Sequence, residues 1–287
     1  MIRLAEGPLE AWVKPQGAEL TSLRLHDTEY LWSGDARFWS KQSPILFPIV
    51  GTLQEGRYRH KDATYCLPRH GFARDRVFAL KALSGQEVTC LLEDDEASRL
   101  VYPFRFHLRI RYFLRATGLQ VEYIVANPSD DSLIFSIGGH PAFALPLEPG
   151  LSYQDYQIDF SHPETVGRWK LRDGLLHEED PGFLQGATSL QLHHELFRED
   201  AIVIQGLQSA CLTLRSDKGS RGLRFGIEGW PMLGLWAPPQ APFVCIEPWQ
   251  GHADPYGYDG TLASKPGVVT LAPGDCWERS WTVEPFN

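Results

Sequence analysis

The clearest alternation of hydrophobic and polar positions lies between Phe104 and Leu114. Apolar residues occupy every second position there, and polar residues fill the others apart from Phe113, which is typical of a strand with one buried face. A Thr117–Gly118 turn follows, and the alternation resumes from Leu119 to Val125. The pattern predicts a long β-hairpin with one buried face.

Further short runs of β-branched, aromatic and aliphatic residues predict strands along the whole chain, with glycines and prolines between them. These runs are Leu9–Val13, Glu19–Leu25, Val77–Leu83, Val88–Leu92, Leu133–Ile137, Ala201–Ile204, Ala210–Arg215, Phe243–Ile246, Val268–Leu271 and Trp277–Val283. Helix signals are poor, and only Glu96–Tyr102 is expected to form two turns, stopped by Pro103. The polar stretch Leu145–Gln185, which holds glycines and prolines, is interpreted as an irregular excursion.

Many short strands at close spacing predict an all-β fold, a large antiparallel β-sandwich with very little helix. The chain has 287 residues, a length that large β-sandwiches reach as single units. We find no internal repeat, low-complexity segment or shift in composition. We therefore expect one domain over residues 1–287.

The charge balance narrows the possible partners. The chain carries 27 basic and 36 acidic residues, a net charge of −9, which argues against a nucleic-acid binder because such a protein needs a basic face. No apolar run approaches the roughly 20 residues that span a bilayer, so no membrane partner is expected. A small neutral molecule is the simpler partner, and nine Trp and ten Tyr provide aromatic surfaces of the kind on which sugars stack.

The cysteines indicate a cytoplasmic protein. Their number, five, is odd, their spacing is wide, and no CxxC pair occurs, which favours reduced thiols over disulfides or a zinc site. The first residues show no hydrophobic signal-peptide region. The sequence does not fix the oligomeric state, and we expect a monomer or a homodimer.

Three short segments place polar groups where a strand pattern would bury them: residues 67–74, 135–143 and 243–249. Glu247 follows Val244, Cys245 and Ile246 directly and precedes Pro-Trp, so its carboxylate is expected at the end of a buried strand. Burial raises the pKa of a carboxyl group from about 4.3 and makes it a better base. A structural acid bonded to turn amides would give the same pattern.

The other two segments each hold a histidine in a tight backbone setting. His140 lies between a Gly-Gly pair and Pro141, and His70 precedes Gly71. Such brackets suit a histidine held at a site, or a turn histidine bonded to backbone carbonyls. Arg74 could clamp a hydroxyl group or an anion with its planar guanidinium, or form a surface ion pair.

Two histidines and one glutamate can also form a metal triad. No two of these residues have a short ligand spacing such as HxH or HxxxH. A carboxylate and an imidazole already make a general base and a general acid near neutral pH. We therefore expect no metal and no cofactor.

At these segments the sequence resembles the aldose 1-epimerase (galactose mutarotase-like) family, in the branch of LacX-like and hexose-6-phosphate mutarotase-like proteins. The matching motifs are HGFAR at 70–74, GGHPAF at 138–143 and IEPW at 246–249, supported by SPILFPIVG at 43–51, LFREDAIV at 196–203 and LGLWAP at 233–238. Their order and spacing extend the resemblance from the first strands to the last. The resemblance implies a β-sandwich isomerase that needs no cofactor.

The resemblance also implies roles for individual residues. Glu247 matches the family's general base, and His140 matches the histidine that protonates the ring oxygen of the sugar. His70 matches the second histidine, which binds the sugar and helps to polarise that oxygen. Asp200 resembles the aspartate that holds sugar hydroxyls, and Arg74 resembles an arginine of the phosphosugar branch.

The remaining predicted contacts bear on the choice of sugar. Trp236 and Trp249 are expected to line the pocket, and Lys41 and Arg74, together with Arg69, could surround a phosphate. The sequence departs from the family where Thr52 stands in place of an arginine, and Lys41 lies one position away from the expected cation. The substrate is therefore expected to be an aldohexose or its 6-phosphate.

Three hypotheses remain at this point. A mutarotase is favoured because Glu247, His140 and His70 are all present. A non-catalytic sugar-binding protein of the same fold is the alternative. A glycosidase would need two facing carboxylates, for which only Glu247 and Asp200 are candidates. The mutarotase hypothesis requires that positions 70, 140 and 247 meet in one pocket.

Overall fold

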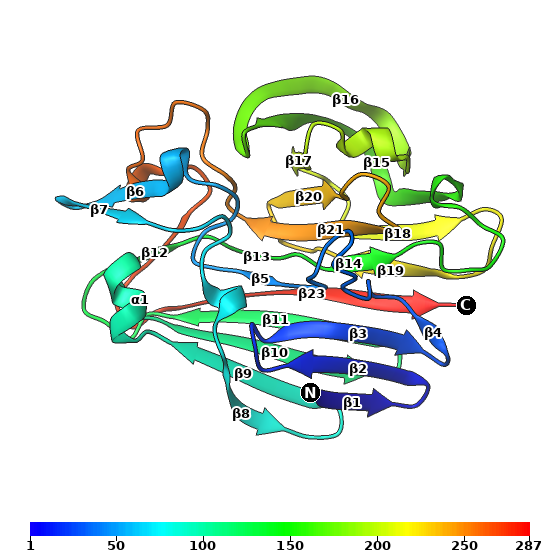
Figure 1. Ribbon diagram of the computed structural model, residues 1–287, viewed down its shortest axis with the longest axis horizontal. Coiled ribbons are helices and arrows are strands. Elements are labelled where there is room, and N and C mark those ends of the chain that lie inside the picture. The colour runs from blue at the N-terminus through cyan, green and yellow to red at the C-terminus, as the bar shows by residue number, and fades with distance from the viewer.

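Antiparallel strands dominate the computed structural model, which describes all 287 residues. A large sheet curves through the whole molecule, and a smaller four-stranded sheet lies in front of part of it (Figure 1). The strands of the smaller sheet are β1 (Ile2–Glu6), β2 (Leu9–Lys14), β3 (Glu19–Leu25) and β4 (Thr28–Glu29). Strands β1 and β2 contact β10 and β3 contacts β23, so the two sheets form a large antiparallel β-sandwich.

The strands of the large sheet follow the order β5-β13-β21-β20-β17-β15-β18-β19-β23-β11-β10-β9-β8, with β14 paired to β21 and β16 paired to β15. Their bounds in chain order are β5 (Ile45–Leu46), β8 (Ala79–Leu83), β9 (Glu87–Glu93), β10 (His107–Arg115), β11 (Gly118–Ala126), β13 (Ile137–Gly139), β14 (Ala142–Ala144), β15 (Tyr156–Arg172), β16 (Leu175–Gln191), β17 (Ile202–Gln205), β18 (Cys211–Ser216), β19 (Gly222–Gly226), β20 (Met232–Trp236), β21 (Phe243–Gln250) and β23 (Cys276–Phe286).

Two short strand pairs and a few helical turns complete the fold. The pairs are β6 (Arg57–His60) with β7 (Ala63–Cys66) and β12 (Leu133–Phe135) with β22 (Val269–Leu271). The single α-helix is α1 (Glu96–Val101), and the 3₁₀ turns are Gln54–Gly56, Ala73–Asp75, Tyr153–Asp155, His194–Phe197 and Leu262–Ser264. The expected helix is confirmed, and it begins with a capping box between Asp95 and Ser98.

The predicted hairpin is confirmed as β10 and β11. Alternate residues of β10 from Leu108 to Leu114 are buried, and the register pairs Arg115 with Gly118, which places the turn one residue earlier than expected. Phe113 stands on the polar face, where the guanidinium of Arg115 lies 4.6 Å from the centre of its ring. The break in the alternation is thus a stacked surface aromatic, and the buried face is uninterrupted.

The interpretation of Leu145–Gln185 as an irregular excursion is wrong. Most of this stretch belongs to the long hairpin of β15 and β16, which arches over the top of the molecule in Figure 1. The hairpin departs from regular pairing at several points, among them Asp159/Glu164 and Val166/Arg168. Much of β16 is exposed on both faces, so its sequence lacks the alternation that identifies a half-buried strand.

The main hydrophobic core is continuous from the first strand to the last. It contains 63 buried residues, drawn from both sheets and running from Ile2 to Val283. Two smaller apolar clusters lie at the pocket described below and include Trp249 in one and Trp32 in the other. No helix of the structure is long and apolar enough to cross a membrane.

Candidate active site

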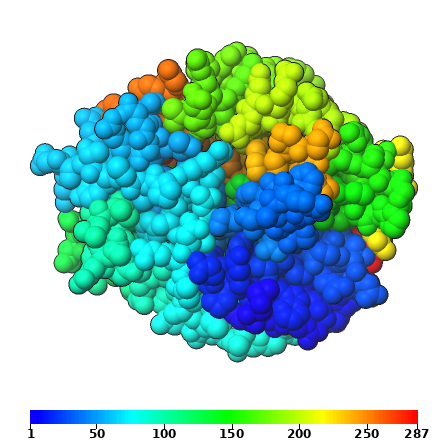
Figure 2. Space-filling model, in the orientation of Figure 1, coloured from blue at the N-terminus to red at the C-terminus, as the bar shows by residue number.

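A pocket of about 170 Å³ gathers residues from distant parts of the chain. In Figure 2 the surface is hollowed near its centre, where segments coloured blue, cyan, yellow-green and orange meet. The pocket is lined by Trp39, Gly51, Arg69, His70, Arg74, His140, Leu171, Gly174, Ala201, Val203, Trp236, Glu247, Trp249 and Ala253. The pocket therefore brings together the three positions, 70, 140 and 247, that the sequence hypothesis requires.

The position of His140 opposite Glu247 follows from an interrupted strand. Strands β13 and β14 both pair with β21, and the chain leaves the sheet between them at His140 and Pro141. The register is the same on both sides of the break, which places His140 opposite Glu247 across the gap. The amide of His140 donates to the carbonyl of Pro44, one step beyond the pairing of β13 with β5, and the carbonyl of Pro141 accepts the amide of Ile246 on β21.

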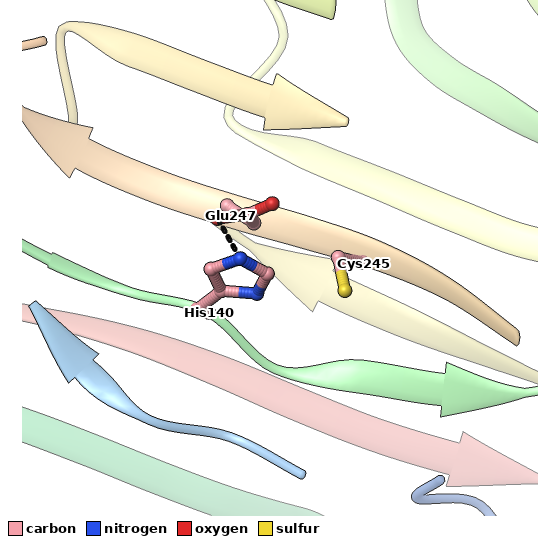
Figure 3. Close-up of side chains that lie close together, drawn as sticks. All are labelled: His140, Cys245 and Glu247. Atoms are coloured by element: carbon pink, nitrogen blue, oxygen red, sulfur yellow. Dashed lines mark ion pairs between the residues drawn. The ribbon is translucent and has the colours of Figure 1, made fainter. Parts of the chain in front are cut away.

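The His140 and Glu247 side chains meet in a buried setting (Figure 3). His140 Nε2 lies 3.2 Å from Glu247 Oε2, but the atoms are not aligned for a hydrogen bond. Glu247 Oε2, His140 Nδ1 and the neighbouring Trp249 Nε1 are all buried without a hydrogen-bond partner. Unpaired buried polar atoms are costly, so their concentration at a pocket indicates a site for a polar ligand.

Burial shifts both groups toward their neutral forms. It raises the pKa of Glu247 well above its ordinary value, and the positive charge of Arg69 opposes this only in part. Burial also lowers the pKa of His140 to about 3, and the charge of Arg69 adds to that effect. Both shifts favour the neutral pair, a protonated carboxyl group beside an unprotonated imidazole.

His70 reaches the pocket from the loop after β7. Its backbone N–H donates to the carbonyl of Gly51, and the Gly51 N–H donates to Nδ1 of the imidazole ring at 3.1 Å. Arg69 Nε approaches Nε2 at 3.3 Å, but a neutral imidazole accepts through only one nitrogen. The Gly51 bond is the shorter and is fixed by the backbone, so we place the proton of His70 on Nε2.

The charge state of His70 fits a hydrogen-bond donor better than a proton source. Burial lowers its pKa well below the ordinary value, and nearby His140 and Arg69 lower it further. The ring therefore remains neutral at physiological pH. In this tautomer Nε2–H faces the Nε–H of Arg69 at 3.3 Å, so Arg69 must turn aside before Nε2–H can donate to an oxygen atom of a ligand.

Two arginines line the pocket, and Asp200, outside the lining, pairs with one of them. Arg69 Nη2 lies 3.5 Å from Asp200, a long ion pair, and Arg74 Nη2 donates to the Arg69 carbonyl at 2.6 Å. Arg74 Nε is buried without a hydrogen-bond partner. Asp200 does not line the pocket itself, and its Oδ1 accepts the Ala201 N–H at 2.8 Å.

Both tryptophans expected at the pocket do line it. Trp236 ends β20, and Trp249 lies on β21 two residues after Glu247. A Cβ atom at Gly138 or Gly234 would come within 2.6 Å of the Trp249 ring, so the glycines of the GGHPAF and LGLWAP motifs make room for this indole. Its position explains why both motifs carry glycine on strands that flank β21.

Lys41 does not line the pocket, and Trp39, which does, was missed. The ammonium group of Lys41 lies 3.1 Å from the carboxylate of Asp75, and its contact with a substrate stays a prediction. Trp39 lies in the same loop and lines the pocket, with its ring stacked on His140. No periodic pattern marks this loop, so a site tryptophan there cannot be told from a packing one by sequence.

One cluster near the pocket has donor atoms suited to a metal. His140, Cys245 and Glu247 place one nitrogen, sulfur and oxygen atom each within 4.8 Å of one another, and all three residues are buried (Figure 3). Burial raises the pKa of the Cys245 thiol well above its ordinary value, so the thiolate that metals bind is disfavoured. The nearby charge of Arg69 also opposes a cation. The expectation of a metal-free site therefore stays a prediction.

Comparison with known proteins identifies the family of this chain. The family model described as aldose 1-epimerase matches residues 1–267. The chromosomal LacX protein of Lactococcus lactis subsp. lactis is 35% identical over 297 residues, covering 100% of this chain and 99% of that protein.

Solved structures with the same fold come from two lactobacilli. A galactose mutarotase related enzyme from Lactobacillus acidophilus aligns with a TM-score of 0.94 at 32% identity, over 99% of this chain and 96% of that one. A galactose mutarotase-like protein from Lactobacillus casei aligns with a TM-score of 0.93 at 29% identity, over 99% of both chains. The model match over most of the chain and the full-length relatives show that this chain belongs to the aldose 1-epimerase family.

Proposed function

We propose that the chain is a mutarotase that interconverts the α and β anomers of an aldohexose by acid–base ring opening. Membership of the aldose 1-epimerase family and the mutarotase-like neighbours support a sugar epimerase. The observation that carries the finer proposal is the buried contact of 3.2 Å between His140 Nε2 and Glu247 Oε2 in a pocket large enough for a ligand. This contact places a proposed general acid and a proposed general base at a single site.

The reaction needs two proton transfers. Glu247, as carboxylate, removes the proton of the C1 hydroxyl, and His140, as imidazolium, delivers a proton to the ring oxygen. The C1–O5 bond breaks and the C1 carbonyl forms. Rotation about C1–C2 presents the other face of the aldehyde, and the reverse transfers close the ring. His70 Nε2–H would donate to the same oxygen as charge develops on it.

The resting proton count of the pair is already the one that the reaction uses. A neutral carboxyl–imidazole pair and a carboxylate–imidazolium pair carry the same single proton, and a small reorientation that aligns Glu247 Oε2 with His140 Nε2, 3.2 Å away, would let the proton pass between them. A sugar hydroxyl that hydrogen-bonds to the carboxylate favours the charged form. Sugar binding would thus prepare both catalytic groups in one step.

A phosphorylated hexose is a second candidate substrate, favoured by the two arginines. Arg69 and Arg74 both line the pocket, and each has one carboxylate nearby, Asp200 at 3.5 Å from Arg69 and Asp75 at 3.8 Å from Arg74. The Asp75 carboxylate is too distant for a hydrogen bond, so Arg74 Nε remains a buried donor without an acceptor. Guanidinium groups bind phosphate oxygens strongly, so a 6-phosphate would suit these arginines.

Polarimetry on freshly dissolved α-anomers tests the proposal. The panel is α-glucose and α-galactose together with their 6-phosphates, and each rate is compared with the uncatalysed rate in the same buffer. Acceleration of any member supports a mutarotase. Binding of these sugars by calorimetry with no acceleration of any of them would favour the non-catalytic sugar-binding alternative.

The same panel separates the two substrate classes. If kcat/KM for a 6-phosphate exceeds that for the free sugar, Arg74→Gln should remove most of the difference and leave the free-sugar rate nearly unchanged. If the free sugars react as well as their phosphates, the arginines serve sugar hydroxyls or hold the loop. Lys41→Gln is the matched control, because this cation lies outside the pocket.

A further inference from the structure

His140 is held in the pocket almost entirely by rings. Its imidazole stacks on Trp39 with centroids 4.8 Å apart and planes at 29°, while Trp236 and His70 meet it nearly at right angles, each at 5.7 Å. Nδ1 has no hydrogen-bond partner. Histidines at active sites are usually oriented by a hydrogen bond on the second ring nitrogen, and here packing must do this.

The stacked contact with Trp39 differs from the other two. In an edge-on contact a ring presents partly positive hydrogens, whereas a near-parallel indole presents its electron-rich face to the imidazole. That face attracts a cation, and tryptophan does so more strongly than other aromatic residues. Trp39 is therefore placed to favour the imidazolium form of His140.

The surroundings of His140 make such a contribution necessary. Burial and the charges of Arg69 and Arg74 all disfavour a proton on the ring. Glu247 is the acidic group in contact with it, and its negative charge is lost once it has taken the proton of the C1 hydroxyl. The reaction nevertheless needs the imidazolium at the moment when the ring oxygen leaves.

The loop that carries Trp39 is built to hold the indole still. Trp32 Nε1 donates to the Trp39 carbonyl at 2.8 Å, and the Trp32 ring packs against Phe38. Further along, the buried carboxylate of Glu19 accepts the N–H groups of Gln42 and Ser43. The loop has no regular secondary structure from residue 32 to residue 44 beyond turns, so these bonds replace a sheet ladder.

We propose that Trp39 is a positioning residue for the general acid: its indole fixes the plane of the His140 ring and stabilises the imidazolium during ring opening. This inference rests on the proposed mutarotase function. It extends the site to a loop that shares no strand with Glu247 or His140. Trp39 would act through His140 and not on the reacting atoms.

The test compares Trp39→Phe with Trp39→Leu on the best sugar of the panel. Phenylalanine keeps an aromatic face, and leucine removes it. We expect Trp39→Leu to lower kcat by about 3- to 30-fold with KM changed by less than about twofold, and Trp39→Phe to retain most of kcat. Phe113→Leu is the control, because it removes an aromatic ring on the polar face of β10 that does not line the pocket, and it should leave both constants unchanged.

Other outcomes overturn the inference. A rise in KM with unchanged kcat would make Trp39 a stacking platform for the sugar, and equal losses in the Phe and Leu variants would show that only indole shape matters. Thermal unfolding of each variant checks the fold, and Trp39→Met replaces the leucine variant if that protein does not fold. An inactive wild type would refute the mutarotase proposal itself, whereas an active wild type with normal Trp39 variants would refute only this inference.

Discussion

Replacing Glu247 by glutamine should destroy activity and leave the fold at least as stable as before. The substitution keeps the shape of the side chain and removes its basicity. Because the carboxylate is the proposed acceptor of the C1 hydroxyl proton, turnover should fall at least tenfold and up to about 10²–10⁴-fold, the usual contribution of a positioned base.

The stability of Glu247→Gln follows from burial. Glu247 is 1% exposed, its Oε2 has no hydrogen-bond partner, and burial raises its pKa. A raised folded-state pKa means that the unfolded chain gives up its proton first, so wild-type stability falls as pH rises from about 4.3 toward the folded value. Glutamine removes that loss. We expect a gain of about 1–3 kcal/mol at pH 7, or a few degrees in Tm, and little change near pH 4.

Glu164 provides the matched control. This glutamate is also fully buried, but its carboxylate accepts the N–H groups of Gln208 and Ser209 far from the pocket. Glu164→Gln should lower Tm and leave kcat unchanged, the reverse of Glu247→Gln. Polarimetry and thermal unfolding of the three proteins provide the test. A Glu247→Gln variant with wild-type turnover would refute its role as base, and one that loses several kcal/mol would make it a structural acid.

Three further predictions follow from the same contacts. The pH profile of kcat should show a plateau wider than the interval between the ordinary pKa values of glutamate and histidine, about 4.3 to 6.5. The pair is active when it carries one proton, and burial lowers the pKa of His140 while it raises that of Glu247, which widens this range. A narrow bell-shaped profile between those two values would contradict the prediction. Lys265→Met should cost about 3–5 kcal/mol in urea unfolding, because it leaves Asp254 buried and unpaired, and a loss below 1 kcal/mol would count against it. EDTA should leave the rate unchanged, because the proposed transfers use protein groups alone; a loss that zinc restores would instead place a metal on His140, Cys245 and Glu247.

The parts of the fold that face the core on one side were predictable. Strand β3 was expected with its observed bounds, and β10 and β11 were expected within a few residues, because one buried face leaves a period of two in the sequence. The hairpin of β15 and β16 was not predicted, because its outer part has no buried face and its pairing shifts at several points. Backbone pairing alone leaves no mark on the side-chain pattern.

The site was predictable only in its residue types. Burial of Glu247 at a strand was expected from the three apolar residues before it. That positions 70, 140 and 247 line one pocket came from the family resemblance, because no periodicity relates residues on three separate segments. Lys41 and Trp39 show the limit of prediction from the sequence. Both lie in one irregular loop, and only the structure shows that the indole lines the pocket and that the ammonium group lies beside Asp75.

The interruption between β13 and β14 connects the fold to the chemistry. Pro141 has no N–H and so cannot donate to β21, but its carbonyl still accepts the N–H of Ile246. The His140 N–H donates to Pro44 on the other side, one step beyond the pairing of β13 with β5, and the unchanged register keeps the imidazole opposite Glu247. Acid and base are therefore set by strand pairing, the most rigid element available, and the loops supply the parts that vary: His70, the arginines and Trp39. On this reasoning, sugar specificity is set by the loops and proton transfer by the sheet.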